Sequence, residues 1–204
     1  MRFAVLGAVM LALTVMACSS STTSPTTSST TPTTPSTTTP AATSATLNVM
    51  LKDGPFVGAK ALLITFSEVS AHLSGGDFTS LSFVGGATSR TCDLEKLTTA
   101  QDVLGTGPLP VGHYTQIRLV VTSATIYFDN ASAGPACAPA IAAPAGRNAT
   151  VRIPSGEVKL NREFDLTATA ATTMLLDFDG DQSVKETGNG QYMMTPVIGI
   201  VSVQ

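Results

Sequence analysis

Residues 61–73 read ALLITFSEVSAHL, an alternation of apolar and polar side chains that is typical of a β-strand with one buried face. The apolar side chains stand at even positions through Ile64 and Phe66, but at odd positions from Val69 onward. Because each face of a strand takes every second residue, this change of phase predicts a β-bulge near residues 67–68. The segment is therefore predicted to be one long, bulged strand of a sheet that covers a core.

Residues 114–128 repeat this pattern, with apolar side chains at odd positions through Val121 and at even positions from Ile126 onward. A second bulge or bend is expected around residues 122–125. The last run, residues 196–203, is apolar in both phases and is predicted to lie centrally, covered on both faces. Shorter strands are expected in five further segments: 46–51, 78–84, 150–153, 164–170 and 172–178.

Seven to nine strands with at most one short helix predict an all-β fold, a single antiparallel β-sandwich. The helix is expected over residues 93–104 (DLEKLTTAQDVL), where Leu94, Leu97 and either Val103 or Leu104 could line one face and Gly105 follows as a stop. Residues 129–147 are rich in Ala, Pro, Gly and Ser, and they are expected to form a surface insertion.

The N-terminal sequence MRFAVLGAVMLALTVMAC has the pattern of a secretory signal, with Arg2 before an apolar run too short for an ordinary membrane-spanning helix. Residues 15–18 (VMAC) resemble a bacterial lipobox, whose Cys is lipidated and becomes the new N-terminus. We therefore predict a lipoprotein signal peptide at 1–17 and acylation, as by palmitate, at Cys18. The alternative is a plain secretory signal with an incidental cysteine. Ser19 in place of Asp favours the outer membrane or the cell surface, by resemblance to Gram-negative lipoproteins.

Residues 18–45 are predicted to be a lipid-anchored linker, because 19–40 contain only Ser, Thr and Pro. Such a segment has no apolar surface to bury, so we expect a disordered stalk before a folded domain at 46–204. The net charge of −3 gives no basic excess, which argues against a nucleic-acid partner. The expected partners are the membrane, through the lipid, and a glycan or an envelope protein; the oligomeric state is not predicted.

The three cysteines divide by position, since assigning Cys18 to lipidation leaves Cys92 and Cys137. An even pair in an oxidising compartment predicts a disulfide bond. This bond would hold the 129–147 insertion to the segment before the predicted helix. A metal site is the alternative for two cysteines, and it requires further ligands beside them.

Four stretches carry a resemblance to a known family: ITFSEVS at 64–70, LPVGHYTQIRL at 109–119, VRIPSG at 151–156, and LDFD, SV, GNGQY and PVI between 176 and 198. They resemble the domain of unknown function family 4382, found in bacterial and archaeal surface lipoproteins. The resemblance covers about residues 46–203 and implies a β-sandwich of the prealbumin or carboxypeptidase-regulatory-like kind. In LPVGHY it implies that Pro and Gly set a turn and that Tyr114 enters the next strand. It implies no activity.

The best candidate for chemistry is the acidic segment 177–183, DFDGDQS. Several carboxylate oxygens on one flexible loop are what Ca²⁺ requires, so Asp177, Asp179 and Asp181 are the predicted cation ligands. The segment departs from an EF-hand loop, which needs Gly at its sixth position and Glu at its twelfth. The alternative is that Asp177 and Asp179 face water, opposite a buried apolar face of the same strand.

Catalytic residues are not predicted. The sequence has two histidines, His72 and His113, and no Gly-x-Ser-x-Gly nucleophile motif. Glu68 and His72 share a phase and are expected on the outer face of their strand, and His113 is expected to be a solvated turn residue. A sugar site would need exposed aromatic side chains, and the sequence has no Trp. The candidates are few: Tyr114, Tyr127, Tyr192, Phe78 and Phe83.

The sequence therefore predicts a non-catalytic lipoprotein of the bacterial cell envelope, which presents a β-sandwich binding or structural module on a flexible stalk and uses no cofactor. The alternative is a Ca²⁺-stabilised adhesion or carbohydrate-binding module. A small hydrolase is a more distant alternative. The ligand-binding residues and the ligand are not predicted.

Overall fold

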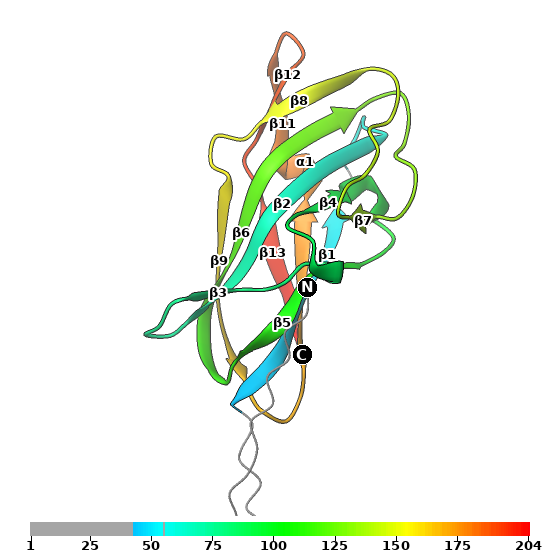
Figure 1. The fold of residues 1–204 in the computed structure, drawn as a ribbon. Coiled ribbons are helices and arrows are strands. Elements are labelled where there is room, and N and C mark those ends of the chain that lie inside the picture. Colours follow the sequence, from blue (N-terminus) through cyan, green and yellow to red (C-terminus); the bar gives the residue numbers. More distant parts are fainter. Residues whose placement is uncertain (1–42, 55) are drawn as a thin grey trace, which may run out of the picture. The chain divides into compact units, whose positions relative to one another are not determined.

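The structure is a computed structural model, and it describes residues 43–54 and 56–204. These residues form thirteen strands in two sheets, with one short α-helix and two 3-10 turns (Figure 1). The predicted all-β sandwich is confirmed, with more strands than expected because several have only two to five residues. The predicted signal peptide, Cys18 and most of the predicted linker lie outside the described residues. No helix in the described part of the chain is long and apolar enough to cross a membrane.

The smaller sheet has four strands, in the order β13 (Ile198–Val203), β10 (Thr172–Asp179), β1 (Ser44–Gly54) and β5 (Asp102–Pro110). The pairs β1–β5 and β10–β13 are antiparallel, whereas β1 and β10 run parallel. An entirely antiparallel sandwich was expected from the sequence. The parallel pair joins two strands from opposite ends of the domain, which only a crossover connection can bring side by side.

The larger sheet is built around β6 and β2, and its main path has seven strands in this order: β11 (Val184–Gly188), β12 (Gln191–Met194), β8 (Asn148–Arg152), β6 (Gly112–Tyr127), β2 (Ala61–Leu73), β4 (Arg90–Asp93) and β7 (Cys137–Ala138). Two more strands pair beside this path, β3 (Phe78–Ser80) with β2 and β9 (Glu157–Leu166) with β6. β12 and β8 form the second parallel pair. The N-terminal half of β6 pairs with β9 and its C-terminal end with β8, so β8 and β9 follow one another along the same side of β6.

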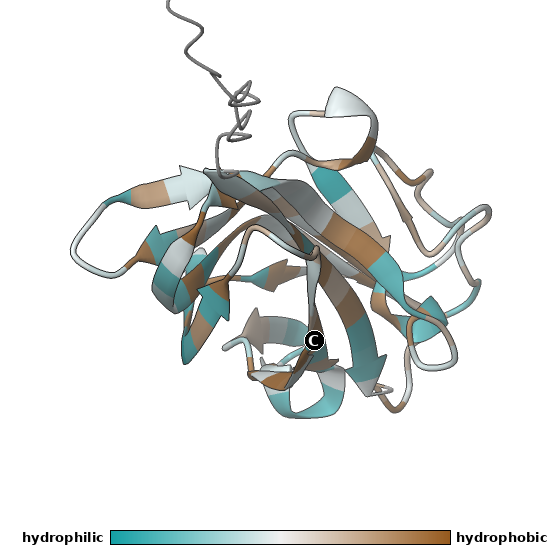
Figure 2. Cartoon of the chain, turned by 90° about the horizontal axis from the view of Figure 1, so that it is seen from below, coloured by the Kyte–Doolittle hydropathy of each residue, from teal (hydrophilic) through white to brown (hydrophobic). Residues whose placement is uncertain are grey.

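The core lies between the two sheets and is filled by every second side chain of their strands. Figure 2 shows the result as hydrophobic and hydrophilic segments that alternate along the strands. The fully buried side chains of the smaller sheet include Leu47, Val49, Leu51, Met174, Leu176 and Phe178. Those of the larger sheet include Leu62, Ile64, Phe66, Ile117, Leu119 and Ile126. The phases predicted for β1, β2, β6 and β10 are therefore confirmed.

Both predicted bulges are present, and they lie opposite each other in the β2–β6 pair. Phe66 pairs with Val121 and Glu68 with the residue before it, so Ser67 and Thr122 are the extra residues. The hydroxyl of Thr122 donates a hydrogen bond of 3.3 Å to the carbonyl oxygen of Thr65 on the facing strand. Because each strand carries one extra residue, the two strands return to the same register beyond the bulges.

The turn between β5 and β6 has the form that the family resemblance implies. Pro110 ends β5, and Gly112 begins β6 with a φ of 153°. Tyr114 follows inside β6, fully buried and stacked on Phe164 with 5.3 Å between ring centroids. Its hydroxyl donates a hydrogen bond of 2.8 Å to the carbonyl oxygen of Pro110. The tyrosine thus ties the turn to the core from which the next strand starts.

The helix predicted over 93–104 is wrong. Only residues 94–96 turn, as the 3-10 element η2 (Leu94–Lys96), and residues from Asp102 onward form β5. Pairing with β1 overrides the weak helical pattern, because β1 needs a partner on that edge. Gly105 belongs to this strand rather than ending a helix. A Cβ there would lie 3.3 Å from the Cβ of Val69 on the facing sheet, so glycine allows a close approach.

The strand predicted at 196–203 is present as β13 (Ile198–Val203), but its predicted central position is wrong. β13 is an edge strand of the smaller sheet, paired only with β10. Gly199 and Val201 are exposed, Val201 to 53%, so one face of this strand is not covered. The apolar run does not require a central position, because β-branched residues favour strands at the surface as well as in the core. The two remaining short elements are η1 (Val84–Gly86) and the helix α1 (Gly180–Ser183).

Candidate functional site

Three hollows meet at one end of the larger sheet, and Tyr192 lines all three. Their volumes are about 540, 460 and 440 Å³. The largest lies along β8 and β12, and the two smaller ones share Phe128, the residue that follows β6. We use the name Tyr192 surface for six of the lining residues: Phe128, Arg147, Asn148, Thr150, Arg152 and Tyr192.

The parallel pairing of β8 and β12 positions this surface, with Tyr192 in register with Val151. Val151 is buried in the core, so the alternation of the strand leaves Thr150 and Arg152 exposed on the other face. The largest hollow is lined by both of these side chains together with Asn148. A short strand of alternating residues thus supplies both the attachment to the core and the polar lining.

The turn of the β11–β12 hairpin shapes the rim of the hollows. Gly188, Asn189 and Gly190 have φ values of 112°, 54° and 71°, a left-handed run that glycine and asparagine adopt most readily. The carboxylate of Glu186 accepts a hydrogen bond of 3.2 Å from the backbone N–H of Gly190. The sequence GNG therefore closes the hairpin tightly enough to place Tyr192 beside β8.

Two aromatic rings form the apolar part of the surface. The centroids of Phe128 and Tyr192 lie 5.7 Å apart with the rings tilted by 43°, and both side chains are half-buried. The guanidinium carbon of Arg147 lies 5.8 Å from the Phe128 centroid. Arg147 is held there by Asp129, whose Oδ1 accepts from Nε at 3.0 Å and whose Oδ2 accepts from the backbone N–H at 2.7 Å. These hydrogen bonds lower the pKa of Asp129.

The surface combines two half-buried aromatic rings with hydroxyl, amide and guanidinium groups that can form hydrogen bonds. Ring faces give apolar contact area, and polar groups around them fix the orientation of a ligand. Of the aromatic side chains considered from the sequence, Tyr114, Tyr127 and Phe83 are buried. Phe78 is half-exposed but covered by Arg118, whose guanidinium carbon lies 4.0 Å from the ring centroid.

The three aspartates predicted to bind a cation have separate environments. Oδ2 of Asp177 lies 2.6 Å from Nζ of Lys52, its neighbour in the β1–β10 register. Asp179 caps α1, since its Oδ1 accepts the backbone N–H of Gln182 at 2.9 Å. Asp181 is exposed in α1. Within the described ranges, no group of three or more acidic, histidine or cysteine side chains is arranged to hold a metal ion.

A carboxyl group that the sequence did not single out lies beneath this acidic segment. Asp53, near the end of β1, is only 5% exposed, and its Oδ1 accepts a hydrogen bond of 3.1 Å from the N–H of Gly180. Its Oδ2 has no hydrogen-bond partner in the described structure. The pKa of Asp53 is raised to about 8, mainly by burial and further by the charges of Glu95, Asp177 and Asp179, and the Gly180 hydrogen bond opposes this rise.

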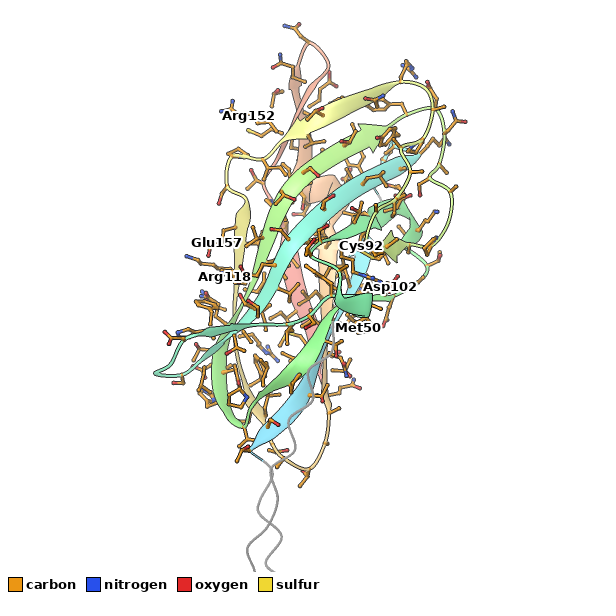
Figure 3. The ribbon with its side chains drawn as sticks, in the orientation of Figure 1. Met50, Cys92, Asp102, Arg118, Arg152 and Glu157 are labelled. Atoms are coloured by element: carbon orange, nitrogen blue, oxygen red, sulfur yellow. A yellow bond between two sulfur atoms is a disulfide. The ribbon has the colours of Figure 1, made fainter. Side chains whose placement is uncertain are left out.

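The predicted disulfide is present and joins Cys92 of β4 to Cys137 of β7, which face each other in the β4–β7 pair. The backbone N–H of Cys137 also donates to Oδ2 of Asp102 at 3.2 Å, and Figure 3 shows Cys92 and Asp102 near each other. Oδ1 of Asp102 binds the buried Arg90 at 2.9 Å. The insertion at 129–147 is further tied down by Ser132, whose hydroxyl donates to the buried carboxylate of Asp93.

The side chains considered for hydrolysis have structural partners. Nδ1 of His72 lies 2.9 Å from the hydroxyl oxygen of Thr115, and Nδ1 of His113 lies 2.9 Å from Oδ1 of Asp165. Glu68 forms an ion pair of 3.0 Å with Arg118, which also reaches Glu157 at 3.4 Å (Figure 3). These contacts link strands across the outer face of the larger sheet.

Tyr192 is one of several aromatic candidates in the sequence, whereas nothing in the sequence singles out Phe128, Arg147 or Arg152. The neighbourhood depends on the parallel pairing of β8 with β12 and on the loop after β6, which are distant in sequence. The available signal was the GNG turn before Tyr192, which marks a hairpin whose second strand carries this aromatic side chain.

Comparison with curated proteins gives no match, and comparison with solved structures gives none either. Comparison with protein families gives one, a domain of unknown function (DUF4382), whose model matches residues 44–196. This range begins at the start of β1 and includes both sheets except for β13. The family resemblance noted in the sequence is thus confirmed over most of the chain, and the chain belongs to the DUF4382 family.

Proposed function

We propose that the chain is a non-catalytic ligand-binding module of the bacterial cell envelope, presented on a Ser/Thr/Pro stalk by a lipid attached to Cys18. The convergence of three hollows on Tyr192 carries the binding role. The lipobox-like residues 15–18 and the uncharged linker that follows support the anchor. The histidines support a non-catalytic role, because each links two strands of the larger sheet, His72 through Thr115 and His113 through Asp165.

A glycan is the ligand class that the Tyr192 surface fits best. A pyranose ring has apolar C–H faces and a rim of hydroxyl groups, which match the Phe128 and Tyr192 rings and the Arg147 and Asn148 side chains that line the same hollow. The hollows are open rather than enclosed, which suits a chain ligand that extends beyond the site. The proposed carbohydrate-binding role rests on this arrangement and does not require calcium.

Calorimetric titration of the purified full chain with a panel of neutral and acidic oligosaccharides tests this proposal. We expect at least one oligosaccharide to bind and to be recovered chemically unchanged. Tyr192→Ala should weaken that binding by at least about tenfold, as expected for loss of a stacked ring. Val201→Ala, which shortens an exposed apolar side chain on β13, is the matched control and should bind normally. Absence of binding to every oligosaccharide of the panel, or unchanged binding by a folded Tyr192→Ala protein, would refute the site.

A further inference from the structure

The 460 Å³ hollow beside Tyr192 has an apolar wall that the other two hollows lack. It shares Phe128 and Tyr192 with the 440 Å³ hollow, so a ligand that lies on these rings borders both hollows. Two side chains of the loop between β1 and β2, Phe56 and Val57, complete the apolar wall. Phe56 is half-buried, whereas Val57 is 81% exposed. This hollow is thus an apolar recess next to the proposed ring-stacking site.

Glu186 provides a polar group on the same face as Tyr192. The two residues are opposite each other in the β11–β12 pair, and the neighbouring pair of the same phase, Val184 with Met194, is buried in the core. Glu186 and Tyr192 therefore project from one face of the hairpin, and both line the recess. Oε1 of Glu186 accepts the N–H of Gly190, which holds the carboxylate in place. Its second oxygen, Oε2, can accept a hydrogen bond from a ligand.

The loop that carries the apolar wall is fixed at both of its ends. The N–H of Phe56 donates a hydrogen bond of 3.0 Å to Oε1 of Glu95. The N–H of Lys60 donates one of 2.7 Å to the carbonyl oxygen of Tyr127, at the end of β6. Because these contacts order the loop in the free protein, little conformational entropy is lost when a ligand enters the recess.

The charged side chains that line the recess are of both signs. Asp181 and Glu186 are acidic, and Lys185 is basic, with its Nζ donating a hydrogen bond of 2.7 Å to the backbone carbonyl oxygen of Asp181. Such a lining favours a neutral polar group over a strongly charged one. An acetamido group is neutral and combines an N–H donor, a carbonyl acceptor and an apolar methyl group. It therefore matches a recess that combines apolar side chains with a carboxylate acceptor.

From this arrangement we infer that the Tyr192 surface binds a sugar chain whose rings carry acetamido groups. The methyl group lies against Phe56 and Val57, and the amide N–H donates to Oε2 of Glu186. This inference rests on the proposed function and specifies its ligand class. A hydroxyl group at the same ring position keeps a donor but leaves the apolar wall in water. The acetamido sugar is therefore bound more tightly than its hydroxyl analogue.

Chitotetraose and cellotetraose are suitable probes, because they share linkage and length and differ in carrying acetamido or hydroxyl groups at one ring position. Calorimetry on the full chain in mildly acidic buffer should show at least about tenfold tighter binding of chitotetraose. The fully deacetylated tetramer is the third probe, since its protonated amines carry positive charge without the methyl group. It should bind more weakly than chitotetraose.

Two substitutions in the recess test the assigned contacts. Val57→Ser removes an exposed apolar side chain, and Glu186→Gln keeps an oxygen for the Gly190 N–H but loses the charge that strengthens a hydrogen bond. The double variant should bring the affinities for chitotetraose and cellotetraose within about threefold of each other. Glu163→Gln with Val201→Ser is the matched control, because both residues are exposed on other strands, and it should keep the wild-type ratio.

Three outcomes would overturn the inference. Equal binding of chitotetraose and cellotetraose, lost in Tyr192→Ala, would leave the proposed glycan site standing and refute the acetamido preference. A deacetylated tetramer that binds as tightly as chitotetraose would show that the carboxylates attract positive charge. A preference that survives in the folded double variant would place the acetamido group outside the recess. Absence of binding to all three tetramers and to the wider panel would refute the proposed function as well.

Discussion

Asp53 is the residue whose chemistry departs furthest from its sequence context. A carboxyl at the end of a strand next to Gly54 would be expected in water, yet this one is buried beneath α1 with one oxygen unpartnered. A buried carboxyl avoids the cost of an unpaired charge by keeping its proton. The pKa of Asp53 is accordingly raised, to about 8 from 3.8 for an exposed aspartate. The folded protein is thus expected to hold this proton at neutral pH.

The stability of the fold should therefore depend on pH through Asp53. Between about pH 4 and pH 8 the unfolded chain has released the proton while the folded chain retains it, so stability falls as pH rises. Below this range both states are protonated, and above it the loss is constant. Asp53→Asn removes this dependence, so the melting temperature of the variant relative to the wild type should rise from pH 4.5 to pH 8.5, as measured by differential scanning fluorimetry.

Asp77→Asn is the control for this comparison, because Asp77 is an exposed carboxylate in the turn after β2. Its melting curve should follow that of the wild type at every pH. If the Asp53→Asn and wild-type curves run parallel through the whole range, Asp53 does not retain its proton in the folded state.

At the scale of the element, the disulfide fixes β7 and the insertion around it. β7 has two residues and one neighbour, β4, so its own hydrogen bonds give it little stability. The Cys92–Cys137 bond spans 45 residues of sequence, and it lowers the conformational entropy of that loop in the unfolded chain. The bond therefore stabilises the whole domain as well as the insertion.

Replacing both cysteines, as Cys92→Ala with Cys137→Ala, should lower the free energy of unfolding by roughly 4 kcal/mol in the loop-entropy description. Urea denaturation followed by circular dichroism measures this change. Wild-type protein treated with a reductant should approach the stability of the double variant. A loss below about 1 kcal/mol would mean that the buried contacts of Asp93 and Asp102 hold the insertion without the disulfide.

The elements that could be predicted are those whose side chains alternate strictly. β2 and β6 show their buried faces and even their bulges in the sequence, because each apolar side chain there faces the core. The sequence pattern predicts a helix for part of β5 and a central position for the strand β13, and both are edge strands of the smaller sheet. Edge strands take their conformation from one neighbour, and a local pattern does not contain that neighbour. The same limit applies to the Tyr192 surface, which the β8–β12 pairing assembles.

At the scale of the whole molecule, the proposed arrangement is an anchor, a stalk and one β-sandwich. The described domain begins at the first residues of β1, and the family model starts at the same point. The composition of residues 19–40 contrasts with the domain that follows, since all charged residues except Arg2 lie from Lys52 onward. The proposal thus assigns membrane attachment to the first part and ligand binding to the second.

Cys18→Ser tests the assignment of the anchor. When the full chain is expressed in a Gram-negative host, the wild type should sediment with membranes and incorporate labelled palmitate. The variant should do neither, because a signal without the acylated cysteine leaves no acyl chain to bury in the bilayer. Ser19→Ala keeps the cysteine and should behave as the wild type. Membrane attachment of the Cys18→Ser protein would contradict lipidation at this residue.

The two facing bulges bear on how the family can vary in length. Ser67 and Thr122 each add one residue to a strand, and the pairs on either side of them keep a common register. Either residue can therefore be lost, or another gained beside it, without moving any core side chain to the wrong face. Evolutionary insertions and deletions are usually confined to loops. In this family, single-residue gaps are expected in the middle of the two longest strands.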